Sequence, residues 1–129
     1  MISIDTNILA RWITQDDSLQ CKKVELLFSK HSKSKEIFIS DIVLIELEWV
    51  LASVYKFDQK SIIDVLRRIV RVNQFCFQNK KTILRAIEKY SNGGKDFSDC
   101  LIGEVGHEFE CKTYTFDKAL KENPSFILL

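Results

Sequence analysis

The sequence predicts an α/β protein in which helices cover both faces of a short, mainly parallel sheet. Two observations support this class. Strand-like and helical segments alternate along all 129 residues, and the strand-like segments are short and apolar on both faces. Strands buried on both faces are typical of parallel sheets between helices. The length fits a single domain over residues 1–129.

The individual elements follow from apolar spacing and from capping residues. We expect strands at residues 2–4, 36–40, 74–78, 111–116 and 126–129, and helices at residues 7–13, 18–32, 41–55, 59–72, 80–92 and 96–109. Ser40 or Asp41 suits the N-cap of the third helix. Gly93 and Gly94 suit the end of the fifth. The aromatic residues expected in the core are Trp12, Phe28, Trp49 and Tyr55.

Composition excludes several classes of protein. The chain has 19 Lys and Arg against 18 Asp and Glu, so no basic surplus marks a nucleic-acid partner, and such binding would need local clustering. We expect no signal peptide, because an acid at position 5 interrupts the apolar start. No apolar stretch is long enough to span a membrane. The four cysteines lack metal-site spacing and are expected to be reduced core residues of a cytoplasmic protein.

Acidic residues lie where strands end and helices begin. Asp5 ends the first strand and Asp117 ends a later one, while Asp96 and Asp99 open the last long helix. Ligands of parallel sheets bind beyond the carboxyl ends of the strands, so these carboxylates are expected at one edge. Each aspartate alone also has a simpler explanation, because Asp is a favoured helix N-cap and suits the first helical turn.

The two glutamates of the 41–55 helix are expected to differ. Glu46 has only apolar neighbours three and four residues away, whereas Glu48 shares a stripe with Asp41 and Tyr55. We therefore expect Glu48 to be solvated and Glu46 to interrupt an apolar face. An ionised carboxylate there needs a basic partner, a proton or a metal ion.

The last long helix has an unusual side as well. Phe97, Leu101, Val105 and Phe109 are expected to form its apolar face. Asp99 lies off that face, near Gly103 and Gly106. Two glycines within a helix cost about 1 kcal/mol each relative to alanine, so we expect another segment to pack closely there.

Convergence of Asp5, Glu46, Asp99 and Asp117 would require a counter-charge. Two carboxylates 4 Å apart repel by about 4 kcal/mol at an effective dielectric constant of about 20. Oxygen ligands favour Mg²⁺ or Mn²⁺, and the two histidines lack the spacing of zinc ligands. A metal held by acids, without an evident nucleophile, indicates hydrolysis by metal-activated water, often of a phosphodiester.

Four segments together resemble PIN-domain ribonucleases of the VapC toxin type. They are ISIDTNILARWITQDD, FISDIVLIELEWVL, DFSDCLIGEVGHEFECKTYTFDKAL and the terminal FILL. The resemblance runs from residue 2 to residue 129 in the family's order and spacing. It implies a single PIN domain with a three-layer α/β/α fold and Mg²⁺- or Mn²⁺-dependent cleavage of RNA, often tRNA or rRNA. It also implies inhibition by a cognate VapB-like antitoxin, and a homodimer.

The resemblance also implies roles for individual residues. The family's acids fall on Asp5, Glu46, Asp99 and Asp117, and Asp96 matches an additional acid that can assist the site. Asp5 and Asp99 would hold the metal directly or through water. Glu46 and Asp117 would orient water ligands, hold a second ion or help to deprotonate the attacking water. Thr6 would form a hydrogen bond near the acids, and Asn7 would cap the first helix.

Two alternative functions are weighed against the ribonuclease. A haloacid-dehalogenase-like phosphatase also has an Asp after its first strand, but it needs an acid or a threonine two residues later, where this chain has Asn7. A catalytically inactive PIN-like protein-binding module would be expected to have lost some of the acids, and all four are present. Metal-dependent RNA cleavage that an Asp5 variant lacks would separate the three functions.

Overall fold

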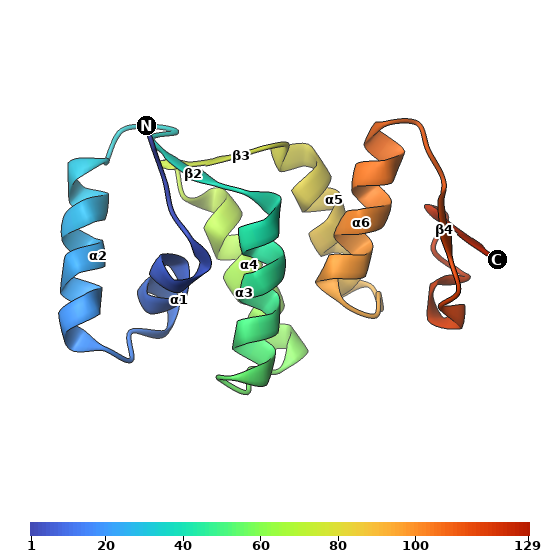
Figure 1. Cartoon of the computed structure of the whole chain (residues 1–129), viewed down its shortest axis with the longest axis horizontal. Coiled ribbons are helices and arrows are strands. Elements are labelled where there is room, and N and C mark those ends of the chain that lie inside the picture. The colour runs from blue at the N-terminus through green and yellow to red at the C-terminus, as the bar shows by residue number, and fades with distance from the viewer. The chain divides into compact units, whose positions relative to one another are not determined.

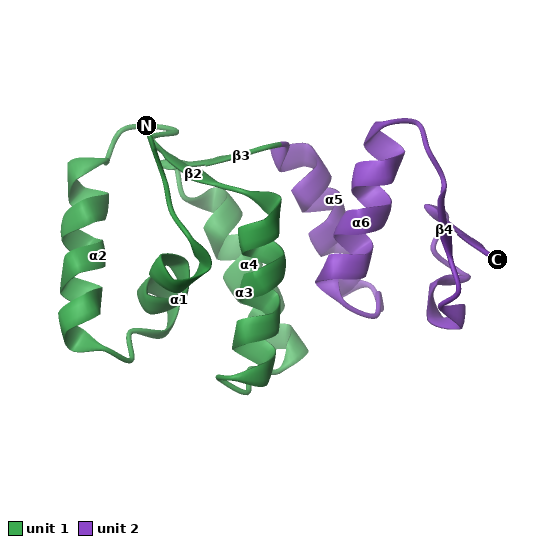
Figure 2. Cartoon of the chain, viewed as in Figure 1, with its two compact units in different colours: residues 1–78 green, residues 79–129 purple.

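The computed structural model describes residues 1–129, which form two compact units. Residues 1–78 form unit 1 and residues 79–129 form unit 2 (Figure 2). Every strand pairing within the units is parallel, which confirms the predicted α/β class with short parallel strands. No helix is both long enough and apolar enough to cross a membrane.

Unit 1 contains three parallel strands and four helices (Figure 1). In chain order its elements are β1 (Ile2–Ser3), α1 (Thr6–Thr14), α2 (Ser18–Lys30), β2 (Ile37–Ile39), α3 (Asp41–Ser53), α4 (Gln59–Arg71) and β3 (Phe75–Phe77). The strand order is β1-β2-β3, with Ile37 opposite both Ile2 and Phe75. Ser40 caps α3, as the sequence suggested. All seven elements agree with the predicted segments to within a few residues.

The core of unit 1 lies between its strands and helices. Leu9 of α1, Ile37 and Ile39 of β2 and Leu44 and Leu47 of α3 are completely buried. Such burial contributes about 1.5–3 kcal/mol for each large aliphatic side chain.

An aromatic cluster adds to this core. The rings of Trp12, Phe28 and Phe75 lie 5.4–5.8 Å apart. Trp12 and Phe28 were predicted core residues, and both are packed here. The prediction was wrong for Trp49, which is 64% exposed. Apolar character alone does not indicate the buried side of α3, because that helix is apolar on its exposed side too.

Unit 2 contains two long helices followed by two short parallel strands (Figure 1). Its elements are α5 (Lys80–Ser91), α6 (Phe97–Glu108), β4 (Thr113–Thr115), the 3-10 helix η1 (Lys118–Leu120) and β5 (Phe126–Leu128). Thr113 pairs with Phe126 in the β4–β5 register. The chain leaves α5 through Gly93, whose φ of 97° is one that glycine adopts without strain, as the sequence predicted.

A buried ion pair holds α5 against α6. Glu104 of α6 is 1% exposed and accepts a hydrogen bond from Arg85 Nε at 3.0 Å and another from Lys89 Nζ. Although burial alone would raise it, these two cations hold the pKa of Glu104 below its ordinary value. The carboxylate is therefore charged and compensated, as a buried charge must be.

The glycines of α6 do meet a closely packed neighbour. A Cβ atom at Gly103 would lie 2.6 Å from Cε2 of Phe126, and one at Gly106 would lie 2.7 Å from Oγ1 of Thr113. The predicted close approach is confirmed, and the neighbours are β4, β5 and the residue before β5. The predicted apolar face was wrong at Phe109, which is 71% exposed because it caps the end of α6.

No disulfide joins any of the four cysteines. Cys21 and Cys100 are buried, as predicted. Cys76 is half-buried and Cys111 is exposed, so the prediction of a core position was wrong for Cys111. Cys111 lies between α6 and β4, where the chain turns at the surface.

We expect Gly103→Ala to lower the melting temperature of the protein. Alanine is the better helix former, but the added Cβ would press on the buried Phe126, and overpacking costs about 1–3 kcal/mol. Gly106→Ala is the matched control, because the half-buried Thr113 side chain can rotate away. Thermal unfolding followed by circular dichroism measures both variants. A Gly103→Ala protein as stable as the wild type would contradict the close packing of α6.

Candidate active site

The first candidate acid is Asp5, which lies at the end of β1 in unit 1. Asp5 caps α1, and its Oδ1 accepts a hydrogen bond from the backbone N–H of Ile8 at 3.0 Å. The simple capping explanation is therefore correct for this residue. The cap fixes the carboxylate at the helix N-terminus, and the residue is exposed, so its other oxygen is accessible to a ligand. Asn7 lies inside α1 and does not cap it, contrary to the role implied by the resemblance.

Thr6 connects this strand end to α3. Its side chain is 7% exposed, and its Oγ1 donates a hydrogen bond to Oε2 of Glu46 at 2.7 Å. Because Thr6 directly follows Asp5, this bond brings the Glu46 carboxylate to the end of β1. The hydrogen bond that the resemblance implied for Thr6 is thus present, and Asp5 and Glu46 lie in one part of unit 1.

The predicted burial of the two glutamates on α3 was wrong. Glu46 is exposed, whereas Glu48 is 9% exposed on the side of α3 that also buries Leu47 and Leu51. The reason is that α3 is apolar almost all round. Ile42, one turn before Glu46, is 67% exposed, so apolar neighbours did not identify the core side. Burial therefore does not distinguish Glu46 from other surface glutamates. Its hydrogen bond with Thr6 does.

Unit 2 contributes three acids around the start of α6. Asp96 caps the helix through Oδ1, which accepts hydrogen bonds from the Asp99 N–H at 2.8 Å and from Ser98 Oγ at 2.9 Å. Asp117 follows β4 and caps η1 through Oδ1, 2.9 Å from the Ala119 N–H. Asp99 lies in the first turn of α6 and is partly buried.

These neighbours change the protonation of the acids in opposite directions. Burial and the adjacent Asp96 carboxylate raise the pKa of Asp99 to about 6. The hydrogen bond from Lys95 lowers the pKa of Asp117. Raised carboxyl pKa values are common where acids gather at functional sites. The start of α6 is therefore a place where negative charge is concentrated.

Lys95 was missed by the sequence analysis. Its Nζ lies 2.7 Å from Oδ2 of Asp117, and this ion pair raises the pKa of the lysine. Lys95 directly precedes the Asp96 cap, and this position was the available signal. It is the cation that the structure places against these acids, and it is itself more than half exposed.

The donor atoms of both units suit a hard divalent cation. All are carboxylate oxygens, which Mg²⁺ and Mn²⁺ prefer. Neither unit by itself brings three His, Cys, Asp or Glu side chains close enough together to form a metal site. The candidate oxygen donors are Asp5 and Glu46 in unit 1, and Asp96, Asp99 and Asp117 in unit 2.

Comparison with known proteins establishes the family. The family model of the PIN domain matches residues 2–125, which include every acid described above. The chain belongs to the PIN-domain family. It is also similar to a VapC ribonuclease from Aquifex aeolicus (strain VF5), with 29% identity over 99 residues that cover 76% of this chain and 73% of that protein. The resemblance to PIN-domain proteins of the VapC type, and with it the α/β/α fold class, is confirmed.

We expect Asp99→Asn to leave the melting temperature of the metal-free protein unchanged or higher at pH 7.5. The pKa of Asp99 is about 6 in the folded chain and 3.8 as its ordinary value. Between about pH 4 and pH 6 the folded chain keeps a proton that the unfolded chain has lost, so the contribution of Asp99 to stability falls as the pH rises. The variant avoids this loss.

Thermal melts at about pH 4.5 and pH 7.5 test this expectation. The difference in melting temperature between Asp99→Asn and the wild type should be more positive at the higher pH. A variant that melts clearly below the wild type at pH 7.5 would show instead that Asp99 mainly stabilises the first turn of α6.

Proposed function

We propose that this protein is a Mg²⁺- or Mn²⁺-dependent endoribonuclease, the toxin of a toxin–antitoxin pair. Membership of the PIN-domain family and similarity to a VapC ribonuclease support a nuclease. They also favour this activity over the phosphatase. The observation that carries the metal dependence is the negative charge at the start of α6, where Asp99 lies beside Asp96 and the Lys95 ion pair is made with Asp117.

Asp5, Glu46, Asp99 and Asp117 are proposed to act together as the catalytic acids of one PIN domain. Asp5 and Asp99 would hold the metal, with Asp96 supporting Asp99. The match to the family model extends across both units, which supports a joint role. A bound Mg²⁺ or Mn²⁺ would lower the pKa of a water molecule and stabilise charge on the phosphate.

The remaining residues would orient the reacting groups. Glu46, aligned by Thr6, would accept a hydrogen bond from the attacking water. Asp117 would do the same or take part in holding a second ion. Lys95 would keep Asp117 ionised through their ion pair, and its exposed ammonium group is available to a phosphate oxygen. Hydrolysis of an RNA phosphodiester is the reaction to which these roles contribute.

The substrate and partner proposals follow the family. We propose tRNA or rRNA as the target, a VapB-like antitoxin as the inhibitor and a homodimer as the assembly, all in the cytoplasm. The similar Aquifex aeolicus protein is named a VapC ribonuclease, which supports the RNA substrate. A catalytically inactive binding module is the remaining alternative, and the following two experiments distinguish it from a nuclease.

RNA cleavage should require a divalent metal. Purified protein should cut cellular RNA with Mg²⁺ or Mn²⁺ and should stop when EDTA is added, because the carboxylates alone supply no activated water. Asp5→Asn protein prepared in the same way controls for contaminating nucleases. Undiminished cleavage in EDTA, absent from the Asp5→Asn preparation, would refute metal dependence. No cleavage by either protein would favour the binding module.

Glu46→Gln should reduce RNA cleavage at least a hundredfold. The change keeps the size of the side chain but removes the charge that Thr6 aligns, and a hundredfold loss corresponds to roughly 3 kcal/mol of transition-state stabilisation. Glu25→Gln, an exposed glutamate on α2, should cleave like the wild type. Glu48→Gln, on the buried side of α3, should alter the melting temperature rather than the turnover of folded protein. An active Glu46→Gln protein would remove Glu46 from the proposed catalytic group.

A further inference from the structure

Unit 1 contains a cavity of about 500 Å³ that begins at Asp5. Its walls come from the first turns of α1 and from one side of α2, so it lies entirely within residues 5–27. Cavities of 300–1,000 Å³ are the usual size for bound small molecules. Because Asp5 is one of the proposed metal ligands, a group bound in this cavity would lie next to the reacting phosphate.

The interior surface of the cavity is largely apolar. Ile8 of α1 and Val24 and Leu27 of α2 contribute to it. Val24 is 3% exposed, while Ile8 and Leu27 are half-buried, so these two side chains present apolar surface on which a ligand can pack. A flat ring suits such a surface better than a charged or strongly hydrated group does.

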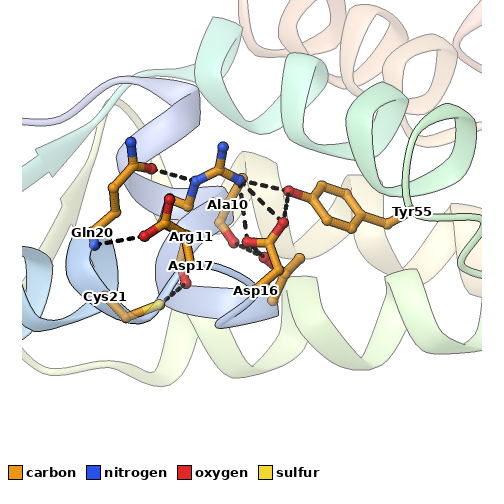
Figure 3. Close-up of polar contacts among 8 residues, drawn as sticks. Ala10, Arg11, Asp16, Asp17, Gln20, Cys21 and Tyr55 are labelled. Atoms are coloured by element: carbon orange, nitrogen blue, oxygen red, sulfur yellow. Dashed lines mark hydrogen bonds and ion pairs between the residues drawn. The ribbon is translucent and has the colours of Figure 1, made fainter.

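A fixed amide group lies beside this apolar surface. Gln20, which also lines the cavity, accepts a hydrogen bond from Arg11 Nε at 2.5 Å (Figure 3). An arginine Nε–H can only donate, so the amide oxygen must face the arginine. The amide NH₂ group of Gln20 therefore faces away from Arg11 and is available to a ligand acceptor.

Arg11 is itself held in place by Tyr55, which follows α3, and by Asp16, which lies between α1 and α2. One terminal nitrogen of its guanidinium lies 2.6 Å from the hydroxyl of Tyr55 and 3.2 Å from Asp16 Oδ1, and the Tyr55 hydroxyl donates to Asp16 Oδ2 at 2.8 Å (Figure 3). This network fixes the amide of Gln20 before any ligand binds. Pre-arranged groups of this kind add specificity at small entropic cost.

Two further polar groups line the cavity. Asn7 is exposed on the first turn of α1 and carries both a donor and an acceptor. Lys23 is exposed on α2 and brings a positive charge. Arg11 is already paired with Asp16, so Lys23 is the cation of the lining that can meet a ligand, beside the single acid Asp5. The lining therefore combines apolar contact, amide groups that can bind a base edge, and a cation that can bind a phosphate.

We propose that this cavity binds the nucleobase of the RNA nucleotide next to the cleaved phosphodiester, with Lys23 on a flanking phosphate. The inference rests on the proposed ribonuclease function and extends it by assigning a specificity-determining subsite. A peptide segment is the other possible occupant of an apolar cavity. The amides of Gln20 and Asn7, together with Lys23 beside the apolar surface, favour a nucleotide.

The test uses cleavage kinetics of the full chain with Mg²⁺. The cleavage site is first mapped on cellular tRNA and rRNA, and a short RNA carrying that site is then made with one abasic nucleotide at each position in turn. Leu27→Trp fills the cavity, and Leu26→Trp is its control, because Leu26 is on the same helix but outside the lining. Lys23→Glu and Lys22→Glu form a second pair that tests the cation without altering an apolar residue.

We expect one abasic position next to the cleaved bond to lower kcat/KM of the wild type at least tenfold. Leu27→Trp should lower kcat/KM on the intact RNA at least tenfold and should be less than twofold sensitive to that abasic position. Lys23→Glu should raise KM at least fivefold, and both control variants should behave like the wild type.

The subsite is refuted if the wild type cleaves RNA but Leu27→Trp and Lys23→Glu match their controls. It is also refuted if the abasic penalty persists in a folded Leu27→Trp protein. Loss of antitoxin binding by Leu27→Trp with unchanged RNA kinetics would assign the cavity to a peptide instead. A wild type that cleaves no RNA would refute the proposed function itself, which is a distinguishable result.

Discussion

The placement of three of the candidate acids depends on N-cap hydrogen bonds. Asp5, Asp96 and Asp117 each use Oδ1 to accept a backbone N–H at a helix start, at 2.8–3.0 Å. Each cap fixes the direction of a carboxylate that would otherwise rotate freely, and it leaves the second oxygen outside that bond. Capping and metal binding are therefore compatible uses of one side chain. The observation that an aspartate caps a helix does not weaken a proposed catalytic role.

The fixed acids create an electrostatic cost that the fold only partly compensates. Lys95 compensates Asp117, but Asp99 remains beside Asp96, and its pKa is about 6. The buried Glu104 is different, because two cations of α5 satisfy it fully. Unit 2 thus contains one acid, Glu104, whose charge is compensated by cations, and another, Asp99, whose ionisation destabilises the fold. Carboxyl groups with a raised pKa, like that of Asp99, are common at functional sites, where a bound ligand can compensate their charge.

The sequence predicted the elements better than it predicted side-chain burial. Glycine, capping residues and apolar spacing located every strand and α-helix but not the short 3-10 helix η1, and the glycines of α6 correctly indicated a close neighbour. Glu46 and Glu48 were assigned to the wrong sides of α3 because that helix is apolar almost all round. The pairing of Lys95 with Asp117 links residues 22 positions apart, and local patterns carry no information about it. The division into two units also had no signal in composition.

The central proposal is that Asp5 and Asp99 both hold the metal. Binding of Mn²⁺ to the metal-free protein tests it most directly. Free Mn²⁺ can be followed by electron paramagnetic resonance at pH 7.5 for the wild type, Asp5→Asn and Asp99→Asn. The account predicts that each substitution weakens Mn²⁺ affinity at least tenfold, since each removes a ligand of the same ion. Wild-type affinity in either folded variant would contradict it, because the remaining acids would then hold the ion alone.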